Sequence, residues 1–436
     1  MRRTASRTTA SLPPGSPEGF NSDLEDAQEV EDVEKALHVE VLTVDECLTE
    51  RLGGKPPPML TTRVASSTRG LTQTEVLYTP TQQLKWVASH HAFVSLAKDK
   101  LCAHPKFQAF SRRELHPTDL EGSLLMHSLH PNSTGKGLPS EIHSESDSTS
   151  HILSKLAHPA AWAIQCTMQE GTAAIPSIPY VSSCSGKKGS GIPDAVLISD
   201  GSHVAKGLGE WKTANSLPAK TLKDVLTFLS SLESTLNVPF RFWWGTQSGP
   251  SSASDESSKI TKILCQLWGQ QEDRPDAMVT CLSSFDVTVF CYRHPEERNL
   301  LLLSDAIPHA WITVMDFMAV FALSLGITKL EKEDLPKLDR ANWATLDDFY
   351  TREPQLFSGL DVRRNVPMIL QQHSAKLKSE AAERLKNKRK KITVPASSRK
   401  LRSKGKVEQD EDDDDDMDGD ITPRPKKRNV FYRSDT

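Results

Sequence analysis

The amino-acid sequence predicts a protein of the α/β class with one core between residues 141 and 330. In this region, patterns typical of helices alternate with short apolar runs typical of strands. Asp200 and Gly201 separate two of the extended runs, and this dipeptide favours a tight hairpin. Long polar stretches flank the core, because only 37% of the 436 residues are apolar.

Composition divides the chain into five segments. Residues 1–60 are rich in Ser, Thr, Pro and acids, and we expect them to be mostly disordered. Residues 61–140 are predicted to be a helical extension, in which residues 82–102 form an amphipathic helix. After the core, residues 331–375 are predicted to be a second helical extension, and residues 376–436 a disordered tail with basic and acidic runs.

The core elements follow from hydrophobic spacing. A helix over residues 145–169 is interrupted by Pro159, which removes a backbone donor. Residues 194–199 and 203–213 form the two strands of the hairpin. The remaining elements are helices over 221–236 and 259–271, strands over 277–282, 287–292 and 300–303, and a buried helix over 310–325. The last helix is too short for a membrane span and contains Asp316, so no membrane association is expected.

The second hairpin strand carries a chemically distinctive pair. Side chains alternate between the two faces of a strand, so Glu210 and Lys212 share a face while Trp211 points the other way. Asp194 begins the preceding strand, and the hairpin can bring it beside Glu210 if the strands are twisted or bulged. The alternative is that Glu210 and Lys212 form an ordinary ion pair on a half-exposed strand.

Two carboxylates held together repel each other, and a divalent cation relieves that repulsion. Hard oxygen ligands favour Mg²⁺ or Mn²⁺. We therefore predict a metal site formed by Asp194, Glu210 and the main-chain carbonyl of Trp211. Such an ion can polarise a phosphodiester and lower the pKa of a bound water. Lys212 would then orient the water or stabilise developing negative charge.

This arrangement resembles the PD-(D/E)xK nuclease superfamily. Pro193 and Asp194 supply the first half of its motif, and Glu210, Trp211 and Lys212 supply the second. Downstream, residues 266–270 and 284–290 are similar to the helix and strand that follow the site in fungal Crinkler-type and kinase-associated members. The resemblance covers about residues 144–305. It implies a restriction-endonuclease-like αβββαβ core with extra helices, and metal-dependent cleavage of phosphodiester bonds.

The same resemblance implies two further site residues. Members often add an acid from the first core helix, for which Glu145 is the first candidate and Asp147 the second. Acids at a helix N-terminus are also common for capping and dipole reasons alone. Gln266 corresponds to a family glutamine that contacts the site or the DNA backbone. The alternative is an ordinary solvated helix glutamine.

The charge distribution points to the nucleus and to nucleic acid. The net charge is −4, but residues 408–420 carry ten acids and no base, and without them the chain would be at about +6. Basic clusters run from Lys386 to Lys391 and from Arg424 to Arg428. Such clusters are typical of nuclear localisation signals and nucleic-acid patches. An import receptor is therefore an expected partner beside DNA.

Three functions remain open from the sequence. The first is a Mg²⁺- or Mn²⁺-dependent nuclease acting on DNA. The second is a nuclear DNA- or chromatin-binding protein that keeps the nuclease fold without cleavage. The third is an effector whose disordered ends carry the activity. The sequence indicates neither the strandedness of the substrate nor the oligomeric state.

Overall fold

The computed structural model describes residues 41–59, 70–132, 137–168, 179–183, 191–199, 204–242, 244 and 256–352, and a few residues of the tail. Contacts between residues divide the chain into two units, residues 1–370 and residues 371–436. In the second unit only Ser379, residues 382–384 and Lys386 are described, and all are helical.

A mixed sheet forms the centre of the first unit. Its strands lie in the order β4 (Tyr180–Ser183), β5 (Ala195–Ile198), β6 (Ala205–Trp211), β8 (Val279–Ser283), β9 (Val287–Arg293), β10 (Leu300–Leu303), β2 (Trp86–Ser89) and β7 (Phe240–Arg241), and β11 (Ile307–Pro308) also pairs with β9. The pairs β6–β8 and β10–β2 are parallel, and the other pairs are antiparallel. A separate small ladder joins β1 (Leu42–Thr43) to β3 (Glu114–Leu115).

Eleven α-helices are described around these strands. They are α2 (Val44–Thr49), α3 (Gln73–Val76), α4 (Phe93–Cys102), α5 (Pro105–Ser111), α6 (Leu120–Leu129), α7 (Glu145–Ile152), α8 (His158–Met168), α9 (Ala219–Leu236), α10 (Glu256–Glu272), α11 (Val314–Ser324) and α12 (Arg340–Arg352). A π-helical segment, η1 (Leu153–Ala157), joins α7 to α8, and two 3₁₀ segments are η2 (His309–Trp311) and η3 (Lys332–Asp334). In the described ranges, no helix combines the length and the apolar character that crossing a membrane requires.

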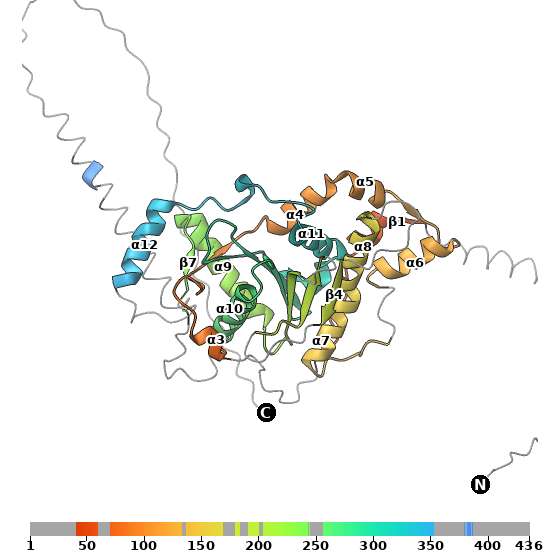
Figure 1. Cartoon of the computed structure of the whole chain (residues 1–436), viewed down its shortest axis with the longest axis horizontal. Helices are drawn as coiled ribbons and strands as arrows, with labels where there is room; N and C mark the ends of the chain where they lie inside the picture. The colour runs from red at the N-terminus through yellow and green to blue at the C-terminus, as the bar shows by residue number, and fades with distance from the viewer. Residues whose placement is uncertain are drawn as a thin grey trace, which may run out of the picture. The chain divides into compact units, whose positions relative to one another are not determined.

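The helices form two layers on the sheet. Figure 1 shows α9 and α10 on one side of the sheet, and α4, α7, α8 and α11 on the other. Helix α11 is apolar on nearly all sides, as expected of a helix buried between a sheet and other helices. It contacts α4 and α8, and Phe317 packs edge-on against Phe290 of β9 with ring centroids 5.4 Å apart. The core therefore lies on both faces of the sheet.

The α/β class agrees with the prediction from sequence. The hairpin strands, the helices α9, α10 and α11, and the strands β8, β9 and β10 lie where apolar spacing placed them, within a few residues. Strands β5 and β6 pair antiparallel, as Asp200 and Gly201 suggested, although the turn itself lies outside the described residues. Of the segments that were expected to be disordered, residues 41–59 are described and include β1 and α2, in which Val44, Cys47 and Leu48 are buried. The rest of residues 1–60 and most of residues 376–436 lie outside the described residues.

The helix predicted over residues 82–102 is wrong in its first half. Residues 86–89 form β2, which is buried and pairs with β10 and β7, and the helix begins only at Phe93. The apolar residues here are buried on both faces, and such a run has no strand-like alternation. Part of the predicted helical extension therefore belongs to the central sheet.

The irregularity predicted at Pro159 lies just before it. The backbone remains helical from Glu145 to Met168, but the segment η1 is π-helical, and the N–H of His158 bonds to the carbonyl of Leu153. A proline in a helix lacks the N–H and crowds the carbonyl four residues earlier. A wider π turn accommodates that ring without breaking the helix.

Candidate functional site

The register of β5 and β6 determines how the acidic residues meet. Ala195 pairs with Gly209, so Asp194 and Glu210 follow at the same end of the two antiparallel strands. A bulge does occur in this pair, but at Leu197 and beyond, away from the acidic end. The pairing therefore brings Asp194 beside Glu210 without the distortion that the sequence seemed to require.

Trp211 lies on the opposite face of β6, as alternation predicts, and is 2% exposed. Its indole folds back over Gly209, where an added Cβ would lie 2.3 Å from the ring. A glycine is therefore required at position 209, because the indole lies too close to the backbone to leave room for a side chain. The packed indole fixes the rotation of the strand, and this rotation turns Glu210 and Lys212 toward the other side.

Asp194 is held by a backbone amide and by the bonds of the segment that precedes it. The amide of Trp211 donates to Asp194 Oδ2 at 2.6 Å. The preceding segment is tied to the end of α10, because Gln270 Nε2 donates to the carbonyl of Ile192 at 3.1 Å and the amide of Gly191 donates to Asp273 Oδ2 at 3.2 Å. These bonds hold the carboxylate at the start of β5.

Glu145 joins the cluster from another element. It is the first residue of α7, where the positive end of the helix dipole favours a negative charge. Lys212 Nζ lies 2.8 Å from Glu145 Oε1 and also contacts Glu210 Oε1. Lys212 is only 4% exposed, so this lysine bridges two carboxylates inside the protein.

Glu210 is fully buried and surrounded by donors. Besides Lys212, Gln266 Nε2 donates to its Oε1 at 2.5 Å, and Gln270 Nε2 donates to its Oε2 at 2.7 Å. Gln266 was expected here from the sequence, whereas Gln270 was not. The two glutamines are four residues apart on α10 and share a helix face, and this spacing was the signal available in the sequence.

Asp194 and Glu210 hold protons more tightly than free carboxyl groups do. Burial, and then the charge of Glu210, raise the pKa of Asp194 to about 7. Burial likewise raises the pKa of Glu210, against the opposing effect of Lys212. Burial alone would lower the pKa of Lys212, but Glu210 and Glu145 outweigh it and raise that pKa above its ordinary value.

These residues fit a divalent cation. Oxygens of Glu145, Asp194 and Glu210 lie within 4.8 Å of one another, and one lysine cannot balance three carboxylates. A carboxylate has about four acceptor sites, so Glu210 retains capacity beyond its three donors. The amide oxygens Oε1 of Gln266 and Gln270 are buried without a hydrogen-bond partner among the described residues. They can accept bonds from waters around an ion.

The structure separates the two candidate helix acids. Asp147 caps α7, since its Oδ2 accepts from the amides of His143 and Ser144, both at 2.9 Å. It therefore acts at the helix end, while Glu145 joins the cluster. For Trp211, the amide rather than the carbonyl faces Asp194. Its carbonyl as a further metal ligand stays a prediction.

A hollow of about 360 Å³ lies next to this cluster. Its lining includes Ser148, one turn after Glu145, and Ala214, two residues after Lys212. Ser284, in the turn between β8 and β9, also lines it.

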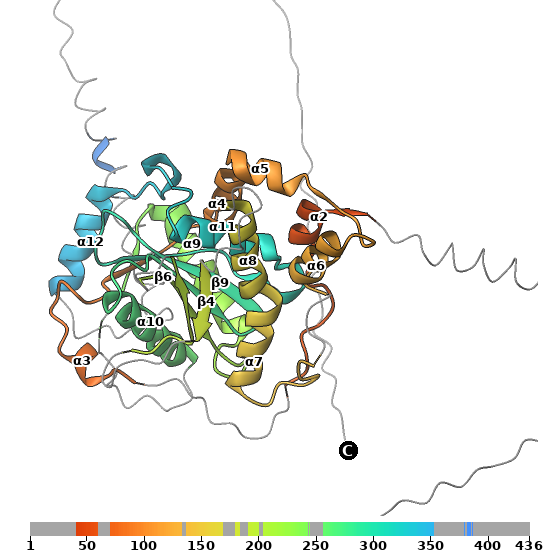
Figure 2. The same ribbon diagram turned by 45° about the vertical axis from the view of Figure 1, so that its right-hand side comes forward.

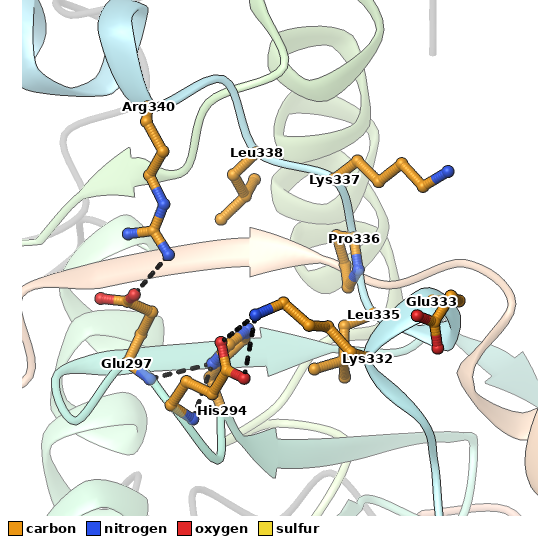
Figure 3. Close-up of a pocket in the computed structure, with 10 residues that line it drawn as sticks. His294, Glu297, Lys332, Glu333, Leu335, Pro336, Lys337, Leu338 and Arg340 are labelled. Atoms are coloured by element: carbon orange, nitrogen blue, oxygen red, sulfur yellow. Dashed lines mark hydrogen bonds and ion pairs between the residues drawn. The ribbon is translucent and has the colours of Figure 1, made fainter.

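Another hollow, of about 370 Å³, lies past the opposite end of β9 (Figure 3). Four of its charged residues form two ion pairs: Arg340 bonds Glu297 at 2.5 Å, and Lys332 bonds Glu296 at 3.2 Å. The ring of His294 accepts from two backbone amides. These five residues therefore have structural partners within the protein.

Comparison with known proteins finds no match, so the function is inferred from the geometry of the site. The chain matches no protein-family model, no curated protein and no solved structure.

Proposed function

We propose that this protein is a metal-dependent nuclease of the PD-(D/E)xK type, which hydrolyses phosphodiester bonds of DNA with Mg²⁺ or Mn²⁺. One observation carries the proposal: Glu145, Asp194 and Glu210 come from three elements and converge within 4.8 Å, with Lys212 bonded to two of them. For each residue alone a structural role is the simpler interpretation. Their convergence in a buried site is harder to explain without an ion.

The order of elements supports the proposal further. Helices α7 and α8 are followed by the antiparallel strands β4, β5 and β6, then by α9, the short strand β7 and α10, and then by β8 beside β6. Apart from β7, which lies at the far end of the strand order, this is the αβββαβ arrangement that the resemblance implies. In Figure 2, α7 and α10 lie near the strands that carry the motif, and both helices contribute side chains to the cluster.

Each side chain has a defined role in this proposal. Asp194 and Glu210 hold the ion, with Glu145 as a third oxygen donor. A bound ion would polarise the phosphodiester and favour ionisation of a coordinated water. Lys212 carries a full positive charge at neutral pH and stabilises negative charge that develops on the phosphate. Gln266 and Gln270 orient the Glu210 carboxylate, as outer hydrogen-bond partners do in other metal sites.

A cleavage assay tests this function. Purified protein should cut DNA in the presence of Mg²⁺ or Mn²⁺, and Asp194→Ala, Glu210→Ala and Lys212→Ala should each abolish cutting. Asp276→Ala is the matched control, since Asp276 is an exposed carboxylate that also pairs with a lysine of β6. Cutting at the level of the unmodified protein in the three site variants would rule out this site.

The location and partners are part of the same proposal. The basic clusters from Lys386 to Lys391 and from Arg424 to Arg428 would bring the protein to the nucleus through an import receptor. Apart from Lys386, they lie outside the described residues. DNA binding that depends on salt, without cleavage under either ion, would instead favour a non-catalytic DNA-binding protein.

A further inference from the structure

An arginine and a tryptophan stack on each other at the surface beside α11. Trp311 is 57% exposed, which is unusual for such a large ring. The guanidinium carbon of Arg51 lies 4.0 Å from its centroid. Backbone contacts fix the pair, because Leu52 donates to the carbonyl of Ile312 at 3.1 Å and Arg51 forms a β-bridge with Thr313. The pair is therefore a built feature of this surface.

The pair borders a hollow of about 400 Å³ with an uncompensated positive charge. Lys98 in this hollow is bonded to the buried Asp316 at 2.8 Å, and His91 is bonded to Asp305. Arg51, in contrast, has no ion pair with any described residue. An exposed cation on an exposed aromatic ring is suited to a ligand that is both anionic and aromatic.

The hollow of about 400 Å³ and the carboxylate cluster lie at the same edge of the sheet, which is the edge where β6 and β8 end and β9 begins. Strand β11, which leads into η2 and Trp311, pairs with the first residues of β9, and β9 follows directly from the end of β8. The end of β8 lies beside the end of β6, where Glu210 is found. From β6 across β8 and β9 to β11 there are three strand steps, or about 14 Å at the usual spacing.

The hollow of about 360 Å³ described above is lined by residues that are close in sequence to both sites. Its outer wall includes residues 55–59, which continue the chain from Arg51, and the amide of Ile142 fastens this wall by donating to the carbonyl of Pro58 at 2.9 Å. Its inner wall includes Ser284, whose buried hydroxyl has no hydrogen-bond partner among the described residues. This hollow therefore offers both polar and apolar contacts to a bound chain.

We propose that this edge binds single-stranded nucleic acid, with one base stacked on the Arg51–Trp311 pair and the adjoining strand directed toward Glu145, Asp194 and Glu210. The inference rests on the proposed function and names its substrate class. Bases of a single strand are free to stack on a protein ring, whereas those of a duplex are stacked on each other. The Arg51 guanidinium can also neutralise a neighbouring phosphate.

Binding to labelled oligonucleotides, measured by fluorescence anisotropy in EDTA so that no cleavage occurs, tests the inference. The probes are oligodeoxyuridine and oligouridine of about 16 nucleotides, and a DNA duplex of the same length. Trp311→Ala and Arg51→Ala should each weaken binding of the single strand by about 5- to 150-fold, the range for losing one stacked base. Trp311→Phe should keep most of the affinity, since a ring remains.

Arg340→Ala is the matched control. Arg340 also lies over a tryptophan ring, that of Trp343 at 5.0 Å, but at the opposite edge of the sheet. This variant should bind like the unmodified protein, and thermal unfolding verifies that every variant is folded. Unchanged binding in both Trp311→Ala and Arg51→Ala overturns the inference, as does tighter binding of the duplex than of either single strand.

The outcomes also separate the inference from the proposed function. Single-strand binding that depends on Trp311, in a protein that cuts nothing with Mg²⁺ or Mn²⁺, supports the inference and removes the nuclease. Cutting that depends on Asp194, in a protein whose Trp311 and Arg51 variants bind normally, supports the nuclease and removes the inference. A preference between oligodeoxyuridine and oligouridine, which carry the same base, identifies the sugar.

Discussion

Two lysines on β6 should respond very differently to the same substitution. Lys212 is buried and contacts Glu210 and Glu145, whereas Lys206 forms a more exposed pair with Asp276 at 3.2 Å. Lys212→Met removes the cation from the carboxylate cluster but keeps a side chain of similar length. Lys206→Met makes the same chemical change on the same strand, at a site where solvent screens the pair.

The expected costs follow from burial. Removing one partner of a buried ion pair costs about 3–5 kcal/mol, while an exposed pair contributes about 0–1 kcal/mol. The pKa of Asp194 and that of Glu210 are already raised, so one of these groups can take up a proton when Lys212 is gone. This protonation limits the decrease in the free energy of unfolding. We expect a decrease of about 3 kcal/mol for Lys212→Met and of under about 1 kcal/mol for Lys206→Met.

Urea unfolding at about pH 8, with and without Mg²⁺, measures both effects. Added Mg²⁺ should recover part of the loss in Lys212→Met, because the ion replaces a missing positive charge, and should leave the cost of Lys206→Met unchanged. Equal costs at the two lysines, or no recovery with Mg²⁺, would refute the reasoning that the cluster is a buried site short of positive charge.

Three other predictions concern the supports of the site. Gly209→Ala should lower the free energy of unfolding by about 1–3 kcal/mol, because a Cβ would collide with the indole of Trp211. Gly207→Ala, whose Cβ would have its nearest contact at 3.4 Å, should lower it clearly less in the same urea assay. Mn²⁺ affinity, measured by calorimetry, should fall about tenfold from pH 8 to pH 6, since protons compete for Asp194 below its pKa of about 7, and a flat profile would contradict that competition. Gln270→Leu should weaken Mn²⁺ binding by about 10- to 100-fold through the misplaced Glu210 carboxylate, and an unchanged affinity would show that Gln270 has only a packing role.

The core of the candidate site could be anticipated because it depends on local rules. Strand alternation alone places Glu210 and Lys212 on one face, and a hairpin between β5 and β6 is enough to bring Asp194 to the same end. The sequence left two candidates for the acidic residue from the helix, because both Glu145 and Asp147 suit a helix N-terminus. Only the three-dimensional packing of α7 shows that Asp147 caps and Glu145 converges.

Features that depend on distant pairing could not be anticipated. Strand β2 is decided by its neighbour β10, which lies far along the chain, and the local pattern of residues 82–102 carries no trace of that partner. The spacing of Gln270 from Gln266 places both on one helix face, but its bond to Glu210 depends on how α10 packs over β6. The surface formed by Arg51 and Trp311 depends in the same way on two segments that meet only in the fold.

Calorimetric titration with Mn²⁺ tests the central claim most directly. The unmodified protein should bind the ion, Asp194→Asn should lose measurable binding, and Asp276→Asn should bind like the unmodified protein. Asparagine keeps the shape of Asp194 and an oxygen that accepts from the Trp211 amide, so the comparison isolates the charge. The same heat of binding in all three proteins would contradict a metal site at Glu145, Asp194 and Glu210.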